Sequence, residues 1–566
     1  MKRALFLLLL AATAAAQPSG SAVHPLSDAA AQPLSDTAPQ LSDSTAQSLS
    51  GTAAKPPSNA AAQSPSNTAQ PLSERIERLF AQSPVTRTAF WGIQVTELST
   101  GKTLYQLNAN RFFVPASNTK LFSTSLALTR LGPDFAFQTR VLAAAAPDAN
   151  GRIAGDLRLV GGGDPNLSAR AIPYRAGPGV VGPGVTGPGV TGTNMGDPLA
   201  AIAALADQVA ARGIQRIDGD IVGDDSWYVW EPFGNGWSID DPTYDYGAPI
   251  SALTVNDNTF TLSVHPGAQD GDPAAIELSP AVEYYSIDNR VRTVAASGDQ
   301  HAERRIHYSR AAGSMTLKLW GAIALGGRGE DLTLGIDDPA LYAAIAFRQA
   351  LEERGITVAG GASTIHLYPN ELADLKQGAP GPPDTDIELA ARTSAPLLED
   401  LRITAKVSQN LHAELDLRAV GRARRNLGSV EAGLDELKAF LTEAGVDPSG
   451  YSINDGSGLA RLNLVSPATV VKLLGYMYAS PARDNFLSIL PVGGQDGTLA
   501  ARFSDPSFAG RIHAKTGSLA HVSALSGYAQ RRRGDWIAFS ILVNNFNGPT
   551  AEVRAVMDRI CALLLE

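Results

Sequence analysis

Strand-like alternation of apolar and polar residues at both ends of the folded sequence is the feature that most constrains the fold. Near the start, AFWGIQVTEL and TLYQLNANRFF flank the turn residues Ser99–Lys102, which is a hairpin pattern. Near the end, RIHAKTGSL, ALSGYAQRR and DWIAFSILVNN precede an apolar helix pattern. We therefore expect one α/β domain, with strands early and late in the folded sequence, that is interrupted by a long insertion. Helices are predicted at 198–212, 338–354, 387–425, 429–445 and 466–479.

The first 72 residues are expected to lie outside the folded region. A positive start, an apolar run and a small-residue exit make residues 1–16 a signal peptide, so we expect a periplasmic or secreted protein. Residues 17–72 repeat variants of QPLSD and read as a disordered tether, because such a composition buries too little apolar area to fold. A second repeat, with the period Pro-Gly-Val, marks a loop at 177–192.

Charge and cysteine content exclude several classes of protein. The net charge of −10 argues against a nucleic-acid partner, which would need a basic face. The single cysteine, Cys561, excludes an intramolecular disulfide and a cysteine-based zinc cluster, and its helix pattern makes it a core residue. We expect no metal or other cofactor, since His412 and His513 lack a metal-ligand spacing. The segments after residue 16 are too polar for a transmembrane anchor.

Ser117 and Lys120 are candidates for a nucleophile and its base. Residues three apart share one face of a helix, so the hydroxyl and the amine can meet. A serine hydroxyl is a poor nucleophile until a neighbour takes its proton, and a lysine can do so only when its pKa is lowered. The apolar surroundings of the pair provide such burial. The alternative is a serine at a helix start followed by an exposed lysine.

Two later motifs argue against that alternative. Ser408-Gln409-Asn410 has the pattern S-x-N, although Ser452 to Asn454 matches it as well. Lys515-Thr516-Gly517 is the only K-[ST]-G in the chain and lies on a predicted strand. The order S-x-x-K, S-x-N, K-T-G is the signature of active-site serine enzymes that react with penicillin.

The chain resembles the D-alanyl-D-alanine carboxypeptidase/endopeptidase family, the class C low-molecular-mass penicillin-binding proteins typified by penicillin-binding protein 4. Further blocks carry the resemblance over residues 74–566: VGGGDPNLS, IVGDDSWY, YGAPISALTVNDN, NDGSGLARLNLVSP and LPVGGQDGTL. It implies a multidomain α/β (α+β) chain, in which a β-lactamase/transpeptidase-like domain with an antiparallel sheet flanked by helices is interrupted by two inserted domains. Such an insertion also fits the long gap between Lys120 and Ser408. The expected boundaries are 73–142 with 376–566 for the catalytic domain, 143–256 with 336–375 for inserted domain II, and 257–335 for inserted domain III.

The resemblance also implies a reaction and a role for each motif residue. Ser117 attacks the carbonyl between two terminal D-alanines, and Lys120 is the base. Ser408 lies on the proton path to the leaving amine, and Asn410 binds the substrate backbone. Lys515 attracts the terminal carboxylate of the substrate. The substrate-binding residues implied are Thr516, Gly517, Ser518, Lys406, Asp224 and Arg461, and the backbone N–H groups of Ser117 and Ser518 form the oxyanion hole.

Three of these residues keep a second interpretation. Lys406 either raises the positive potential that keeps Lys120 neutral or is a solvated helix lysine. Asp224 and Arg461 either line the pocket for the side chain of the stem peptide or are turn and packing residues.

The partners implied are peptidoglycan stem peptides that end in D-Ala-D-Ala, D-Ala cross-links, and β-lactam antibiotics. Carboxypeptidase and endopeptidase activity remain unseparated, because both cut after D-alanine. A penicillin-recognising esterase resembling a β-lactamase is an alternative, and repeated turnover of nitrocefin would favour it. A slow or non-catalytic peptidoglycan-binding scaffold is a second alternative, which predicts muropeptide binding with little release of D-alanine.

Overall fold

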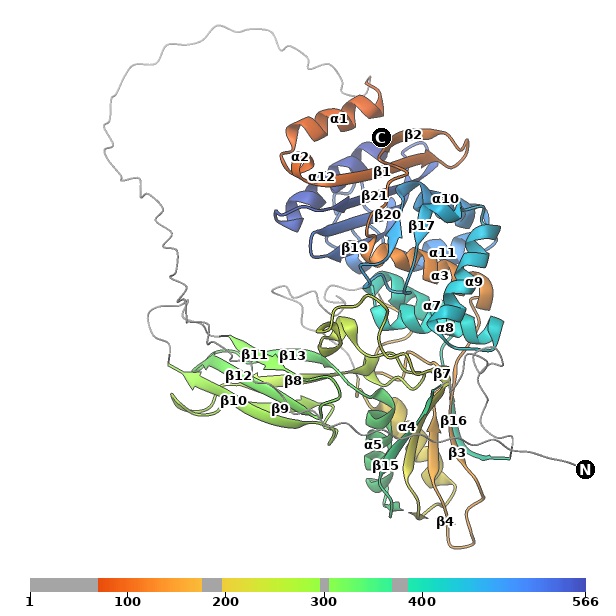
Figure 1. Cartoon of the computed structure of the whole chain (residues 1–566), viewed down its shortest axis with the longest axis vertical. Coiled ribbons are helices and arrows are strands. Elements are labelled where there is room, and N and C mark those ends of the chain that lie inside the picture. The colour runs from red at the N-terminus through yellow and green to blue at the C-terminus, as the bar shows by residue number, and fades with distance from the viewer. Residues whose placement is uncertain (1–69, 176–195, 296–304, 369–384) are drawn as a thin grey trace, which may run out of the picture. The chain divides into compact units, whose positions relative to one another are not determined.

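A computed structural model describes residues 70–175, 196–295, 305–368 and 385–566, all within one compact unit, Asn67–Glu566. The first sheet takes its strands from both ends of that unit and is antiparallel throughout. The N-terminal hairpin lies beside the C-terminal strands, so the chain between them leaves the sheet and returns (Figure 1). The strand order is β19 (Ile512–Leu519), β20 (Val522–Gln530), β21 (Trp536–Asn544), β1 (Phe90–Glu97) and β2 (Thr103–Leu107).

Both faces of this sheet are buried, because successive side chains of a strand point to opposite faces. On β20, Ala524 and Tyr528 belong to one apolar cluster, whereas Leu525 and Ala529 belong to another. Cys561 is fully buried in the second cluster, as expected. The first cluster is covered by α3 (Lys120–Leu131), α8 (Asn410–Arg425), α9 (Val430–Glu443), α10 (Pro467–Ala479) and α11 (Arg483–Ile489), and the second by α1 (Leu72–Gln82), α2 (Val85–Thr88) and α12 (Thr550–Leu564).

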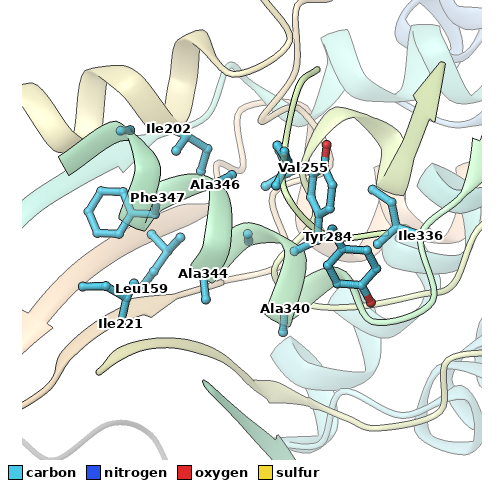
Figure 2. Close-up of a cluster of buried hydrophobic side chains, with 14 of the residues drawn as sticks. Leu159, Ile202, Ile221, Val255, Tyr284, Ile336, Ala340, Ala344, Ala346 and Phe347 are labelled. Atoms are coloured by element: carbon cyan, nitrogen blue, oxygen red, sulfur yellow. The ribbon is translucent and has the colours of Figure 1, made fainter. Parts of the chain in front are cut away.

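The middle of the chain forms a second five-stranded sheet with its own core. Figure 2 shows Ile202 and Phe347, from two helices, together with Leu159 and Ile221 of the sheet. Two of its pairings are parallel and two are antiparallel. The order is β15 (Ala362–Leu367), β7 (Ile221–Val229), β5 (Leu157–Val160), β3 (Gln138–Ala143) and β16 (Ile387–Thr393), and the helices are α4 (Ala200–Ala211) and α5 (Pro339–Glu352).

Smaller sheets complete the described part of the chain. Two three-stranded sheets, formed between residues 259 and 335, contribute to the same apolar cluster as the second sheet. They are β13 (Glu330–Gly335), β8 (Thr259–His265) and β9 (Ala275–Ser279), then β10 (Ser286–Val294), β12 (Thr316–Ala324) and β11 (Ile306–Ser309). The remaining strands are β14 (Thr357–Val358), β6 (Arg216–Ile217) and β4 (Arg152–Ile153), and the pair β17 (Tyr451–Ser452) and β18 (Leu464–Val465).

The predicted hairpin, the three C-terminal strands and most predicted helices are confirmed, but the helix at 387–425 is wrong in its first part. Residues Ile387–Thr393 form β16, an edge strand paired with β3. Pairing with a neighbouring strand here overrides the helix-forming tendency of Glu, Leu and Ala. Helix α7 (Leu397–Arg402) and a π-helical turn, η6 (Ile403–Val407), then precede α8.

Several predictions are not decided by these residues. The signal peptide, the tether up to residue 69 and the Pro-Gly-Val loop lie outside the described ranges. The domain boundaries given above stay predictions. Within the described ranges, every helix is too short or too polar to cross a bilayer.

Candidate active site

Ser117 and Lys120 meet at the start of α3. Ser117 lies in a single 3-10 turn, η2 (Ala116–Thr119), and Lys120 is the first residue of the α-helix that follows. The Lys120 Nζ is 3.0 Å from the Ser117 Oγ. Ser117 is partly exposed, whereas the Lys120 side chain is fully buried. The serine is therefore partly open to solvent, whereas the amine that contacts it is buried.

The backbone before the serine is strained. Ala116 has a φ of 48°, a left-handed conformation that alanine rarely adopts. Such strain persists where the surrounding structure fixes it, and it gathers at functional sites. Here the Asn118 Nδ2, two residues further on, donates to the Lys515 carbonyl at 2.9 Å and ties the turn to β19.

The amine of Lys120 has two further partners. It donates to the Asn410 Oδ1 at 2.6 Å and to the Ser457 carbonyl oxygen at 2.7 Å. Burial lowers the pKa of Lys120 to about 7, although the carboxylates of Asp455 and Glu414 act in the opposite direction. The amine is thus close to half protonated at neutral pH, the condition for a general base.

A second lysine, Lys515, lies on β19 and contacts the middle motif. Its Nζ donates to the Ser408 Oγ at 2.8 Å and to the Thr516 carbonyl at 2.9 Å. Burial, together with the charge of Lys120, lowers the pKa of Lys515 well below its usual value. Ser408 follows the π-helical turn η6 in a left-handed conformation, with a φ of 68°. The three motifs are therefore joined by direct contacts between Lys120 and Asn410 and between Lys515 and Ser408.

The edge strand β19 approaches the nucleophile closely. A Cβ added to Gly517 would lie 2.7 Å from the Pro115 carbonyl oxygen and 3.1 Å from the Ser117 nitrogen, so the approach needs a glycine. The Thr516 Oγ1 is 2.8 Å from the Thr498 Oγ1. Ser518 is exposed, and its Oγ accepts from Arg554 at 2.9 Å.

Gly458 also approaches this turn closely, and its replacement by alanine is expected to destabilise the fold. Its φ is 86°, and an added Cβ would lie 1.9 Å from the Ala116 carbonyl oxygen. Strain and overlap together should lower the free energy of unfolding by at least about 2 kcal/mol, as measured by denaturant titration. Gly475→Ala is the matched control, because its Cβ would meet no atom within 4 Å. Equal stability of the two variants would contradict this prediction.

Lys406 is a buried residue and not a solvated one. Its Nζ donates to the Asp496 Oδ2 at 2.6 Å and to the Leu490 carbonyl at 2.8 Å. Burial lowers the pKa of Lys406, while Asp496 opposes this change. The structure therefore rules out a solvated lysine, and the contribution of Lys406 to the positive potential at Lys120 stays a prediction.

The structure does not bring Asp224 to the three motifs. It is buried on β7 of the second sheet, where its carboxylate accepts from Arg158 and Ser226. Arg461, in contrast, is exposed beside the β19–β20 hairpin and donates to the Ala520 carbonyl at 3.3 Å. It lines a pocket of about 380 Å³ together with His521 and residues at the end of β21.

Two residues that contact the site, Tyr246 and Ser457, were not predicted from the sequence. The Tyr246 carbonyl accepts from the Asn410 Nδ2 at 2.8 Å, and Ser457 acts on Lys120 through its carbonyl. The pattern S-x-x-K alone also does not identify the nucleophile, because it occurs a second time in the chain. Ser99 and Lys102 share it, but both are exposed in the turn between β1 and β2. Among the described residues, no group of three His, Cys, Asp or Glu could hold a metal ion.

Comparison with known proteins matches the chain to a protein family. The model of the D-Ala-D-Ala carboxypeptidase 3 (S13) family matches residues 72–564. A D-alanyl-D-alanine carboxypeptidase from Actinomadura sp. (strain R39) is 34% identical over 506 residues, which is 88% of this chain and 84% of the relative. The D-alanyl-D-alanine carboxypeptidase DacB of Haemophilus influenzae is 24% identical over 459 residues, 81% of this chain and 85% of that protein.

Solved structures agree with the fold. The crystal structure of penicillin binding protein 4 (dacB) from Haemophilus influenzae matches with a TM-score of 0.70 at 23% identity, over 86% of this chain and 98% of that one. The same protein complexed with a novel β-lactam matches with a TM-score of 0.67 at 21% identity, over 87% and 99% of the two chains. Because the family model spans nearly the whole described chain, the protein belongs to the D-Ala-D-Ala carboxypeptidase 3 (S13) family.

Proposed function

We propose that the protein is a serine-type D-Ala-D-Ala carboxypeptidase that acts on peptidoglycan stem peptides through an acyl-enzyme on Ser117. The observation that carries the proposal is the 3.0 Å contact between the accessible Ser117 hydroxyl and the buried Lys120 amine, whose pKa is about 7. Membership of the family and the relative named a D-alanyl-D-alanine carboxypeptidase support the reaction. The structure of a penicillin binding protein of the same fold complexed with a β-lactam supports binding of β-lactams by this chain, and we propose that they acylate Ser117.

The partners of Lys120 supply a path for the first proton. A neutral amine has two N–H groups and one lone pair. Asn410 Oδ1 and the Ser457 carbonyl can accept the two N–H groups, which leaves the lone pair for the Ser117 hydroxyl. The proton moves to Lys120 Nζ as the Ser117 Oγ bonds to the carbonyl carbon between the terminal D-alanines.

The second lysine serves the other end of the substrate. Two buried amines close together resist carrying two positive charges, so a proton on Lys515 favours a neutral Lys120. The terminal carboxylate of the substrate would favour the charged form of Lys515. Ser408 gives its proton to the leaving D-alanine amine and takes one from Lys515, to which it is bonded. Water then attacks the ester. One water proton returns to Lys515 through Ser408, and Lys120 returns its proton to Ser117, which restores the enzyme.

The same chemistry includes cross-link cleavage. When the leaving amine belongs to a second stem peptide instead of free D-alanine, bond breaking and proton delivery are unchanged and the protein acts as an endopeptidase. Such a substrate places the protein in the periplasm or outside the cell, in keeping with the predicted signal peptide. The roles of Thr516, Gly517 and Ser518 in binding, and of the Ser117 and Ser518 N–H groups as an oxyanion hole, belong to this proposal. So does a contact of Arg461 with the stem-peptide side chain.

The proposal is tested by release of D-alanine from a peptide that ends in D-Ala-D-Ala. We expect multiple turnovers of the peptide and, after penicillin G, a long-lived adduct of one penicilloyl group seen by intact-mass spectrometry. Fast turnover of nitrocefin without a lasting adduct would instead favour the esterase alternative. Binding of muropeptides without release of D-alanine would favour the scaffold.

A further inference from the structure

A buried carboxylate, Asp257, contacts the S-x-N motif through Gln409. It forms an ion pair with Arg170, and the His412 Nε2 lies 3.2 Å from its Oδ1. Its Oδ2 accepts from the Gln409 Nε2 at 2.9 Å. Burial would raise the pKa of Asp257, but Arg170 and His412 outweigh it and hold the pKa well below its usual range. The group is therefore an anion with three donors around it.

The residue that Asp257 holds is the centre of the S-x-N motif. Gln409 lies between Ser408 and Asn410, and its side chain is buried. Its Oε1 accepts from the Leu411 N–H at 3.2 Å and caps α8, while its Nε2 reaches Asp257. One buried side chain thus connects the helix start, the left-handed Ser408 and the Asp257 carboxylate. A left-handed serine persists only where its surroundings fix it.

The support comes from a segment distant in sequence. Asp257 and Tyr246 both lie between β7 and β8, and the Tyr246 carbonyl accepts from Asn410. The turn that carries Asp257 is itself strained, because Asn256, Asp257 and Asn258 all have φ values between 50° and 56°. The Asn258 side chain fixes it by donating to the Pro249 carbonyl at 2.8 Å. This segment therefore contacts two successive residues of the motif.

His412, on α8, connects this cluster to Asp400 on α7. Its Nδ1 lies 2.7 Å from the Asp400 Oδ1, and Asn166 donates to the same oxygen at 2.9 Å. Burial lowers the pKa of His412, but Asp400 and Asp257 outweigh it and raise the pKa to about 9. A protonated His412 pairs with both carboxylates, so α8 is fixed in its first turn, two residues after Asn410.

We propose that Asp257 is a positioning residue that holds Gln409, and through it Ser408 and Asn410, in the arrangement that acylation of Ser117 requires. This inference rests on the proposed function. It assigns the segment between β7 and β8 a part in the reaction, although that segment is remote from the nucleophile in sequence. Because Asn410 contacts Lys120, a shift of the motif would also move the base.

The test uses a reversal of the contact in the full chain. Gln409→Glu keeps an acceptor for the Leu411 N–H but places a carboxylate against Asp257, and Asp257→Asn removes the anion. Each single variant should slow acylation by a fluorescent penicillin by about 10-fold or more, since each disrupts a buried charged contact. The double variant lets the amide of the new asparagine donate to the new glutamate, so it should recover most of the lost rate. Recovery by the double variant is not expected of two independent packing defects.

Asp225→Asn is the matched control. Asp225 is a buried carboxylate of the second sheet, paired with His366 at 2.8 Å and bonded by Ser251 at 2.8 Å. Its replacement should lower the melting temperature but leave acylation of the folded protein unchanged. Wild-type rates in Gln409→Glu and Asp257→Asn, or rates in the double variant no better than the singles, would overturn the inference. A wild type that forms no adduct would instead refute the proposed function.

Discussion

Replacement of Ser117 by alanine is expected to abolish the covalent adduct with penicillin G. Among the described residues, Ser117 supplies the hydroxyl that contacts the Lys120 amine, at 3.0 Å. Loss of a serine nucleophile leaves only the catalysis supplied by binding and oxyanion contacts. The release of D-alanine should therefore fall by at least ~10⁴-fold. Intact-mass spectrometry after exposure to penicillin G measures the adduct, and a D-alanine assay measures the turnover.

Ser99→Ala is the control for this prediction. Ser99 has the same spacing to a lysine, but it is exposed in the turn between β1 and β2. This variant should form the adduct at the wild-type rate. An adduct on Ser117→Ala would show that a different hydroxyl is the nucleophile, with Ser408 as the next candidate because it contacts Lys515.

The sequence predicted the three motifs because each is a local pattern and their order is specific. It predicted that burial would lower the pKa of Lys120, and the fully buried side chain agrees. The strands near both ends were also predictable, since β1 and the C-terminal strands alternate in residue type. The sequence predicted one helix where the chain forms strand β16 and then helix α7. The residues of β16 favour a helix, but they join a sheet because they pair with β3.

The supporting contacts could not be predicted from single residues. The carbonyl groups of Tyr246 and Ser457 are backbone atoms, so the residue type carries no signal for them. Asp257 meets Gln409 across a long separation in sequence, and no local pattern records that contact. The burial of Lys406 was not predictable for a related reason, because its partner Asp496 is also remote in sequence. Long-range pairing of buried charges is a property of the folded chain.

The rate of acylation is expected to rise with pH through about 7 and to lose this dependence when Lys120 is replaced by methionine. Burial lowers the pKa of Lys120 to about 7, and only the neutral amine can accept the Ser117 proton. Below that pH the ammonium predominates, so the wild-type rate falls as the pH falls. In Lys120→Met a side chain of similar length fills the buried space without a base. The rate at pH 8 should drop by ~10²–10⁴-fold.

Stopped-flow acylation between pH 5 and 9 measures this dependence, with circular dichroism to confirm that Lys120→Met is folded. Lys102→Met is the control, since Lys102 has the same spacing to a serine but is exposed, and its profile should match the wild type. A profile in Lys120→Met that keeps the rise near pH 7 would assign the titration to another group. Lys515 would then be the candidate, because burial and the charge of Lys120 lower its pKa as well. In the wild type, the positive charge of either amine disfavours protonation of the other, so the observed midpoint belongs to the pair and should move when Lys515 is replaced.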